Sequence, residues 1–130
     1  VSAVTDVTGF GLIGHLSHIL EASHVAAELT FDQLPLLPLA ARLAERGFVP
    51  GGTRRNLEAA SKVTWDPALS ESDRLLCTDA QTSGGLLLAV PPEHHAALVE
   101  ALREEAVPAV ATIGRLVTGD RGTIKVSRSN

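Results

Sequence analysis

The sequence predicts a mixed α/β domain of the α+β kind, in which helices flank a mixed β-sheet. Two patterns support this: apolar residues at helical spacing alternate with short β-branched or apolar runs, and the last third reads strand-helix-strand-strand. That last order resembles part of a ferredoxin-like unit. Because 45% of the 130 residues are apolar, residues 1–130 can form one domain with a sizeable core.

The first half predicts a helix, a strand, a second helix and a loop. Residues 10–22 place their apolar side chains on one helical face, and residues 25–31 form a β-branched and apolar run bounded by polar residues. Pro38 is suited to the first turn of the next helix, and Gly47 to its left-handed end. The stretch "VPGGTRRN", residues 49–56, predicts a loop.

Residues 62–65 predict a short strand, and a short helix should follow it. Ser70 and Asp73 have the spacing of a capping box, for a helix that ends near Cys77. A glycine-rich loop, "DAQTSGG", follows at residues 79–85.

The last third begins with "LLLAV", residues 86–90, an unbroken apolar run typical of a central strand that is buried on both faces. A helix is expected at residues 93–106, with Leu98, Val99 and Leu102 facing inward. Residues 111–117 and 123–126 should then pair as a hairpin around "TGDRG".

Charge and composition limit the classes of partner. A net charge of −4 and a pI near 5.7 argue against binding to nucleic acid or to an anionic membrane surface. No apolar run is long enough to span a bilayer, and no signal peptide pattern is visible. The one cysteine excludes an internal disulfide and fits a reducing compartment. We therefore expect a cytoplasmic protein without nucleic-acid or membrane partners.

Gly9, Gly11 and Gly14 have the G-x-G-x-x-G spacing of dinucleotide-binding folds, and Glu28 and Asp32 lie about where a ribose-binding acid would be expected. The context argues against that function. Residues 5–8, "TDVT", do not form the apolar strand that should lead into the glycines, and the Asp6 carboxylate would repel a pyrophosphate.

Asp6 has two other interpretations, and the residues alone leave both open. Magnesium is commonly bound by one or two carboxylates together with substrate phosphates, so Asp6 beside the glycine-rich start of a helix suits a metal–phosphate pair. In the simpler interpretation Asp6 or Thr8 caps the helix, and the glycines permit close helix packing.

The remaining reactive side chains give weaker signals. His15 and His18 could share a metal, but a solvated or interdomain face explains them better. Cys77 is interpreted as a small residue at a helix end, with a nucleophilic role as the weaker alternative. Arg54 and Arg55 could meet a phosphate, although a solvent-facing pair is the simpler account.

Three strings in the sequence resemble a known family in their order and spacing. They are "TDVTGFGLIGHL" (5–16), "PGGTRRN" (50–56) and "DAQTSGGLLLAV" (79–90). Together they resemble the C-terminal domain of selenophosphate synthetase, also called selenide, water dikinase, within the aminoimidazole ribonucleotide synthetase superfamily. The resemblance spans nearly the whole chain.

The resemblance implies an ATP-dependent enzyme that makes selenophosphate, AMP and orthophosphate from selenide, ATP and water. It also implies that residues 1–130 are the C-terminal fragment of a two-domain enzyme whose active site lies between the domains. The N-terminal domain of the family carries the reactive cysteine or selenocysteine, the lysine and most metal-binding aspartates, so Cys77 does not inherit a catalytic role. Family members dimerise mainly through that domain, and the fragment is expected to be monomeric and inactive by itself.

Transferred to this sequence, the resemblance makes Asp6 the Mg²⁺ ligand that faces the ATP phosphates and assigns no catalytic residue. The remaining candidate residues would form the wall of the ATP site: Thr8, Gly9, Thr82, Ser83, Gly84, Gly85, Gly52, Thr53 and Asn56. Two alternatives remain, which are another ATP-dependent enzyme of the superfamily and a non-catalytic stand-alone binding domain. The reading frame upstream of Val1 would distinguish the dikinase from the binding domain.

Overall fold

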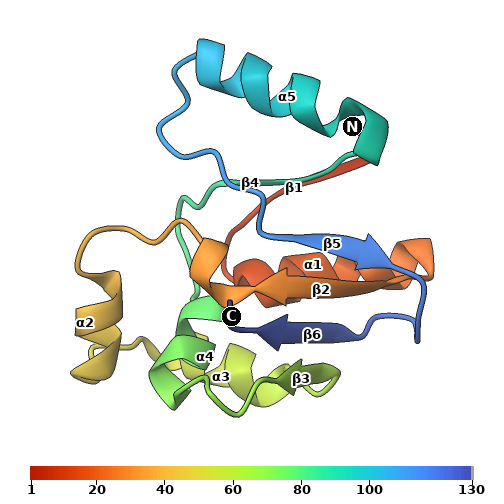
Figure 1. Cartoon of the computed structure of the whole chain (residues 1–130). Coiled ribbons are helices and arrows are strands. Elements are labelled where there is room, and N and C mark those ends of the chain that lie inside the picture. The colour runs from red at the N-terminus through yellow and green to blue at the C-terminus, as the bar shows by residue number, and fades with distance from the viewer. Residues whose placement is uncertain (130) are drawn as a thin grey trace.

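The computed structural model describes residues 1–129, and it confirms the mixed α/β class (Figure 1). Its strands are β1 (Ala3–Asp6), β2 (Ala26–Thr30), β3 (Val63–Trp65), β4 (Leu86–Ala89), β5 (Gly114–Val117) and β6 (Ile124–Ser127). Its helices are α1 (Gly11–Ser23), η1 (Phe31–Gln33, a 3₁₀ turn), α2 (Ala40–Glu45), α3 (Gly51–Ala59), α4 (Glu71–Cys77) and α5 (Pro92–Glu104).

The main sheet has four strands in the order β3-β6-β2-β5. β2 lies between β6, which is parallel to it, and β5, which is antiparallel. The predicted β5–β6 hairpin is therefore wrong. The connecting loop carries the chain past the end of β2, where Gly122 adopts a φ of 81° and its N–H donates to the Val25 carbonyl. β6 thereby pairs with the edge of β2 opposite to β5. Because most residues of β2 are buried, its main-chain groups need hydrogen-bond partners on both edges.

A separate two-stranded ribbon is formed by β1 and β4, which pair antiparallel from Ala3–Ala89 to Asp6–Leu86. The prediction of a central, doubly buried strand at residues 86–90 is therefore wrong: β4 pairs only with β1, and Leu86 is 70% exposed. Leu87 does pack against the core. In Figure 1 the ribbon runs between α5 and the four-stranded sheet.

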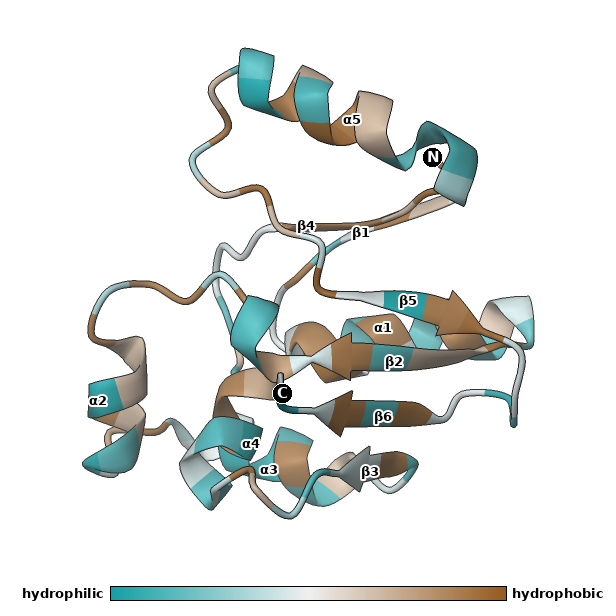
Figure 2. Cartoon of the chain, viewed as in Figure 1, coloured by the Kyte–Doolittle hydropathy of each residue, from teal (hydrophilic) through white to brown (hydrophobic). Residues whose placement is uncertain are grey.

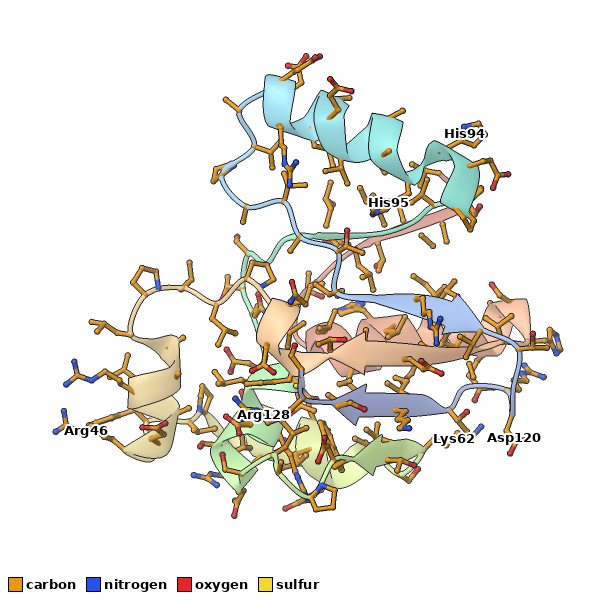
Figure 3. The ribbon with its side chains drawn as sticks, viewed as in Figure 1. Arg46, Lys62, His94, His95, Asp120 and Arg128 are labelled. Atoms are coloured by element: carbon orange, nitrogen blue, oxygen red, sulfur yellow. The ribbon has the colours of Figure 1, made fainter. Side chains whose placement is uncertain are left out.

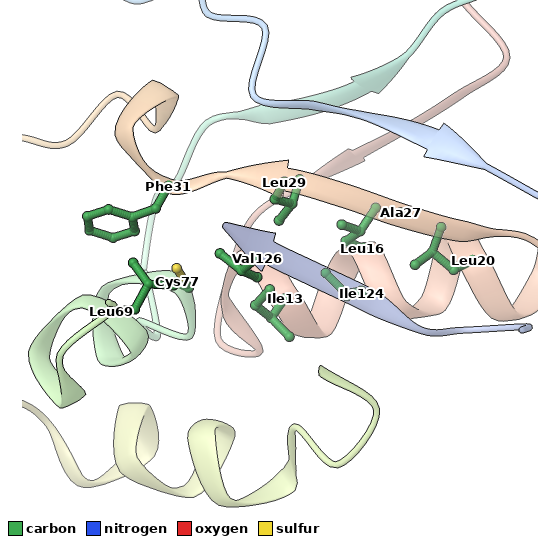
Figure 4. Packing of buried hydrophobic residues seen from close by; sticks show 10 residues of the cluster. All are labelled: Ile13, Leu16, Leu20, Ala27, Leu29, Phe31, Leu69, Cys77, Ile124 and Val126. Carbon is green, nitrogen blue, oxygen red and sulfur yellow. The ribbon is translucent and has the colours of Figure 1, made fainter. Parts of the chain in front are cut away.

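The core lies where α1 packs against the main sheet (Figure 4). α1 buries Ile13, Leu16 and Leu20, which confirms its predicted apolar face. Their partners come from β2, η1, β6 and the segments around α4: Ala27, Leu29, Phe31, Leu69, Cys77, Ile124 and Val126. Figure 2 shows this apolar interior as brown segments along α1, β2 and β6.

Two helix predictions need correction. The predicted loop at residues 49–56 is wrong, because α3 begins at Gly51 directly after the extended N-cap residue Pro50. The helix expected from Pro38 begins instead at Ala40, because Leu39 adopts a left-handed conformation with a φ of 69°. By contrast, the capping box of α4 is confirmed: the Asp73 N–H donates to the Ser70 hydroxyl, and the Ser70 N–H donates to the Asp73 carboxylate.

Candidate functional site

The turn between β1 and α1 is bound to the glycine-rich loop 79–85 through main-chain hydrogen bonds. The Val7 N–H donates to the Gly85 carbonyl at 2.9 Å, and the Gly84 N–H donates to the Val7 carbonyl at 3.1 Å. The Gln81 N–H donates to the Thr8 carbonyl at 3.1 Å. Two of the three family-like strings, residues 5–16 and 79–90, therefore form one structural unit.

Two glycines make this close approach possible. A Cβ at Gly84 would overlap the Val7 carbonyl, and a Cβ at Gly11 would lie 2.7 Å from the Thr78 carbonyl oxygen. Gly11 also has a φ of 72°, which a side chain would strain. Gly9 and Gly85 differ, because a Cβ at either would meet nothing within 4 Å. The first pair is needed for packing, whereas the second pair leaves open space.

The third string joins the same unit through α3. The Thr53 side chain, 1% exposed, donates from Oγ1 to Asp79 Oδ1 at 2.6 Å, and accepts from the Ala80 N–H at 3.0 Å. Asn56 Nδ2 donates to the carbonyls of Gly9 and Thr78, at 2.9 and 3.0 Å. Thr53 and Asn56 thus hold the β1–α1 turn and the glycine loop together.

Asp6 is the last residue of β1 and is exposed at the edge of this unit, paired across the ribbon with Leu86. The capping alternative is wrong, because the N-cap residue of α1 is Phe10 and no side chain caps that helix. Among residues 1–129, no group of three metal-binding side chains lies close enough together to hold a metal ion.

The other predicted site residues surround this point. Thr82, Ser83, Gly9 and Gly85 are exposed, and Thr8 and Gly84 are half-buried. Gly52 lies near the start of α3, where a Cβ would be 3.6 Å from that of Ala80. All three predicted groups thus lie around the β1–α1 turn and the glycine loop.

Asp79 and His15 were not selected as site residues from the sequence. Asp79 is the first residue of the "DAQTSGG" string, and its position there could have indicated that it belongs to the site. The His15 Nε2 atom lies 3.1 Å from the Thr8 backbone N and 2.9 Å from its Oγ1, a contact that no pattern in the sequence indicates. His18 is exposed on the same helix and contacts the Phe10 ring.

Cys77 is a buried structural residue. Its side chain is 0% exposed, and burial, reinforced by the charge of Asp73, raises the pKa of the thiol to about 12. A thiol with this pKa is protonated at neutral pH and is a poor nucleophile. The interpretation of Cys77 as a small residue at a helix end is confirmed.

The dinucleotide interpretation is not supported, for reasons that partly differ from those seen in the sequence. A strand, β1, does precede the glycines, but it lies outside the four-stranded sheet. The proposed ribose acids are occupied elsewhere: Glu28 pairs with Arg115 at 2.9 Å, and Asp32 pairs with Arg128 at 2.9 Å. Both carboxylates are thus engaged in ion pairs with arginine side chains.

The family model described as AIR synthase related protein, C-terminal domain, matches residues 1–127. The chain belongs to this family. As an AIR synthase related domain, it is 44% identical over 118 residues to the selenide, water dikinase of Shewanella baltica, covering 91% of this chain and 33% of that protein. It is also 41% identical to the enzyme of the same name from Pasteurella multocida, covering 89% and 32%.

The domain spans about a third of the length of these curated relatives. Its fold is also similar to that of the thiamine-monophosphate kinase from Stenotrophomonas maltophilia, with a TM-score of 0.55 and 23% identity, over 95% of this chain and 30% of that one. This likeness concerns the fold alone. No helix within residues 1–129 is long and apolar enough to cross a membrane.

Proposed function

We propose that this domain is the C-terminal part of a selenide, water dikinase, which converts selenide, ATP and water into selenophosphate, AMP and orthophosphate. One observation carries the proposal: the three strings that resemble that family, which are far apart in the sequence, meet around the β1–α1 turn. The 41–44% identity to proteins of that name supports the same function. The proposal includes a cytoplasmic homodimer held together by its N-terminal domains.

In this proposal the β1–α1 turn and the glycine loop form one wall of an ATP site shared with an N-terminal domain. The exposed residues Thr82, Ser83 and Gly85 offer hydroxyls and an open main chain to the phosphates. Thr53 and Asn56 support this wall and do not contact ATP through their side chains, because those side chains already hydrogen-bond to Asp79 and to the Gly9 carbonyl.

Asp6 would hold Mg²⁺ together with phosphate oxygens and carboxylates of the N-terminal domain. A single exposed carboxylate fits this role, because Mg²⁺ retains several waters and is commonly bound through one or two protein carboxylates plus phosphates. When bound, Mg²⁺ supplies neutralisation of the phosphate charge. The contribution of the chain is positional: Val7, beside Asp6, is fixed by two main-chain bonds to the glycine loop, which sets where the carboxylate lies.

The proposal is tested by formation of AMP from ATP and selenide by the full-length protein. Asp6→Asn should lower the turnover by at least about 100-fold, in line with the loss of a preorganised electrostatic group, and should leave the unfolding temperature unchanged. Asp120→Asn is the matched control, because Asp120 is an exposed aspartate in the β5–β6 loop (Figure 3). Near-normal turnover of Asp6→Asn would remove Asp6 from the metal site.

A further inference from the structure

His15 lies on α1, and its imidazole reaches back to the turn that precedes the helix. Its Nε2 atom is 3.1 Å from the Thr8 backbone N and 2.9 Å from Thr8 Oγ1. Both residues are half-buried, so water competes only in part for these groups. The contact links the second turn of α1 to Thr8, which lies two residues after Asp6, the end of β1.

The chemistry of the two groups determines which nitrogen of His15 carries the proton. A backbone N–H can only donate, so Nε2 must accept from Thr8. A neutral imidazole has one acceptor nitrogen, and its proton is then on Nδ1. The Thr8 hydroxyl must donate to the same lone pair, which makes a three-centre hydrogen bond.

The main chain of Thr8 is held on both of its sides. Its carbonyl accepts from the Gly11 N–H at 3.0 Å and from the Gln81 N–H at 3.1 Å, so it joins the start of α1 to the glycine loop. Its N–H has His15 as its partner. Thr8 therefore joins the two segments, as Val7 does through its own main-chain bonds, and His15 supplies the only side-chain acceptor for the Thr8 N–H within residues 1–129.

We propose that His15, in its Nδ1–H tautomer, is a positioning residue that fixes the Thr8–Gly9 turn. This inference rests on the function proposed above, in which the Thr8–Gly9 turn is part of the wall that faces MgATP. His15 itself contacts no phosphate in this account, because its Nε2 is already engaged with Thr8. It acts through the main chain of Thr8, two residues after Asp6.

A role in packing alone is the competing explanation. The His15 ring also lies edge-on to Phe10 and His18, with centroid distances of 5.8 and 6.1 Å. His18 serves as a comparison, because it belongs to the same aromatic cluster, with its ring centroid 5.6 Å from that of Phe10. Because His15 is half-buried and His18 is exposed, a packing role also predicts the larger effect at His15. Rescue by His15→Gln, whose side-chain oxygen can accept the same hydrogen bond, distinguishes the two explanations.

The first test measures the tautomer and the bond directly in this chain. NMR of ¹⁵N-histidine should show the Nδ1–H tautomer for His15. Amide hydrogen exchange at Thr8 should accelerate about fivefold to tenfold in His15→Leu, equivalent to about 1 to 1.4 kcal/mol for one net hydrogen bond. Exchange should stay within about twofold of the original rate in His18→Leu and in His15→Gln, whose side-chain oxygen can still accept.

An Nε2–H tautomer, or unchanged Thr8 exchange in His15→Leu, would overturn the proposal. If His15→Leu fails to fold, the tautomer and the exchange rate in His15→Gln still decide, because a packing role does not predict rescue by glutamine.

The second test uses the full-length protein and the KM for MgATP. His15→Leu should raise this KM roughly fivefold, and His15→Gln should restore it. An unchanged KM together with accelerated Thr8 exchange would overturn the link between this turn and the ATP site. Absence of any AMP formation by the unmodified protein would instead refute the proposed function, and the tautomer result would stand independently of it.

Discussion

Thr53→Val tests whether α3 fixes the glycine loop through one buried hydroxyl. Valine has nearly the shape of threonine, so the change removes two hydrogen bonds and leaves the volume intact. The lost bonds are the 2.6 Å donation to Asp79 and the 3.0 Å acceptance from the Ala80 N–H. A hydrogen bond to a charged group contributes about 1.5–3 kcal/mol and a neutral one about 0.5–1.5 kcal/mol.

The sum is about 2–4.5 kcal/mol, and we expect the lower end because Asp79 is only half-buried and water can replace part of the loss. With a urea m-value of about 2 kcal/mol/M, the midpoint of unfolding should fall by roughly 1 M. Thr64→Val, at an exposed threonine of β3, is the control and should change stability by no more than about 0.5 kcal/mol. A midpoint for Thr53→Val equal to that of the original chain would refute this account of the loop.

Three further predictions concern packing, pH and ligand binding. Gly84→Ala should destabilise the chain by about 1–3 kcal/mol in urea unfolding, because its Cβ would meet the Val7 carbonyl, whereas Gly85→Ala should be nearly neutral; equal effects would contradict the packing argument. The Ser129 N–H, followed by Arg128, lowers the pKa of Asp32 below its ordinary value of 3.8. The stabilisation from ionised Asp32 is therefore complete above about pH 4 and is lost as the pH falls through the folded-state pKa of Asp32. Arg128→Met (Figure 3) removes one cause of the lowered pKa and should make the unfolding temperature fall less steeply with acidification. The same dependence of unfolding temperature on pH in the variant and the original chain would contradict this role of Arg128. The chain alone should bind MgATP weakly, because no group of three metal-binding side chains lies close together within residues 1–129, and micromolar or tighter affinity in calorimetry would exclude the shared site.

The elements that the sequence predicted well are those fixed by local signals. The α4 helix begins at the Ser70–Asp73 capping box, and the face of α1 with Ile13 and Leu16 follows from helical spacing. Both signals act within a few residues, so tertiary structure had little opportunity to override them.

The errors arose where long-range pairing decides. β5 and β6 have the spacing of a hairpin, but β2 accepts one on each edge, and only the assembled sheet reveals this. The apolar run of β4 suggested a central strand, yet its apolar side chains serve a two-stranded ribbon with one face toward the core. For α3, Gly51 and Gly52 suggested a loop, but glycine is tolerated in the first turn of a helix that Pro50 begins.

The site was predictable as a set of segments and less so as a set of contacts. The strings around Asp6, Thr53 and Gly84 were selected from the sequence, and the structure brings their segments together. The residues that hold these segments in place, Asp79 and His15, could not be identified in the same way. Asp79 bonds to Thr53, 26 residues away, and His15 bonds to Thr8, 7 residues away, and sequence spacing does not predict either contact.

The most direct test of the central claim locates the metal–nucleotide complex relative to this wall. Mn²⁺ can replace Mg²⁺ with a non-hydrolysable ATP analogue in the full-length protein, with this domain labelled with ¹⁵N, and paramagnetic broadening of the amide signals is then measured. The account predicts the strongest broadening at residues 5–11 and 79–85 and weaker broadening in the β5–β6 loop around Asp120. Broadening of that loop as strong as at residues 5–11, or sharp signals at residues 5–11, would contradict it.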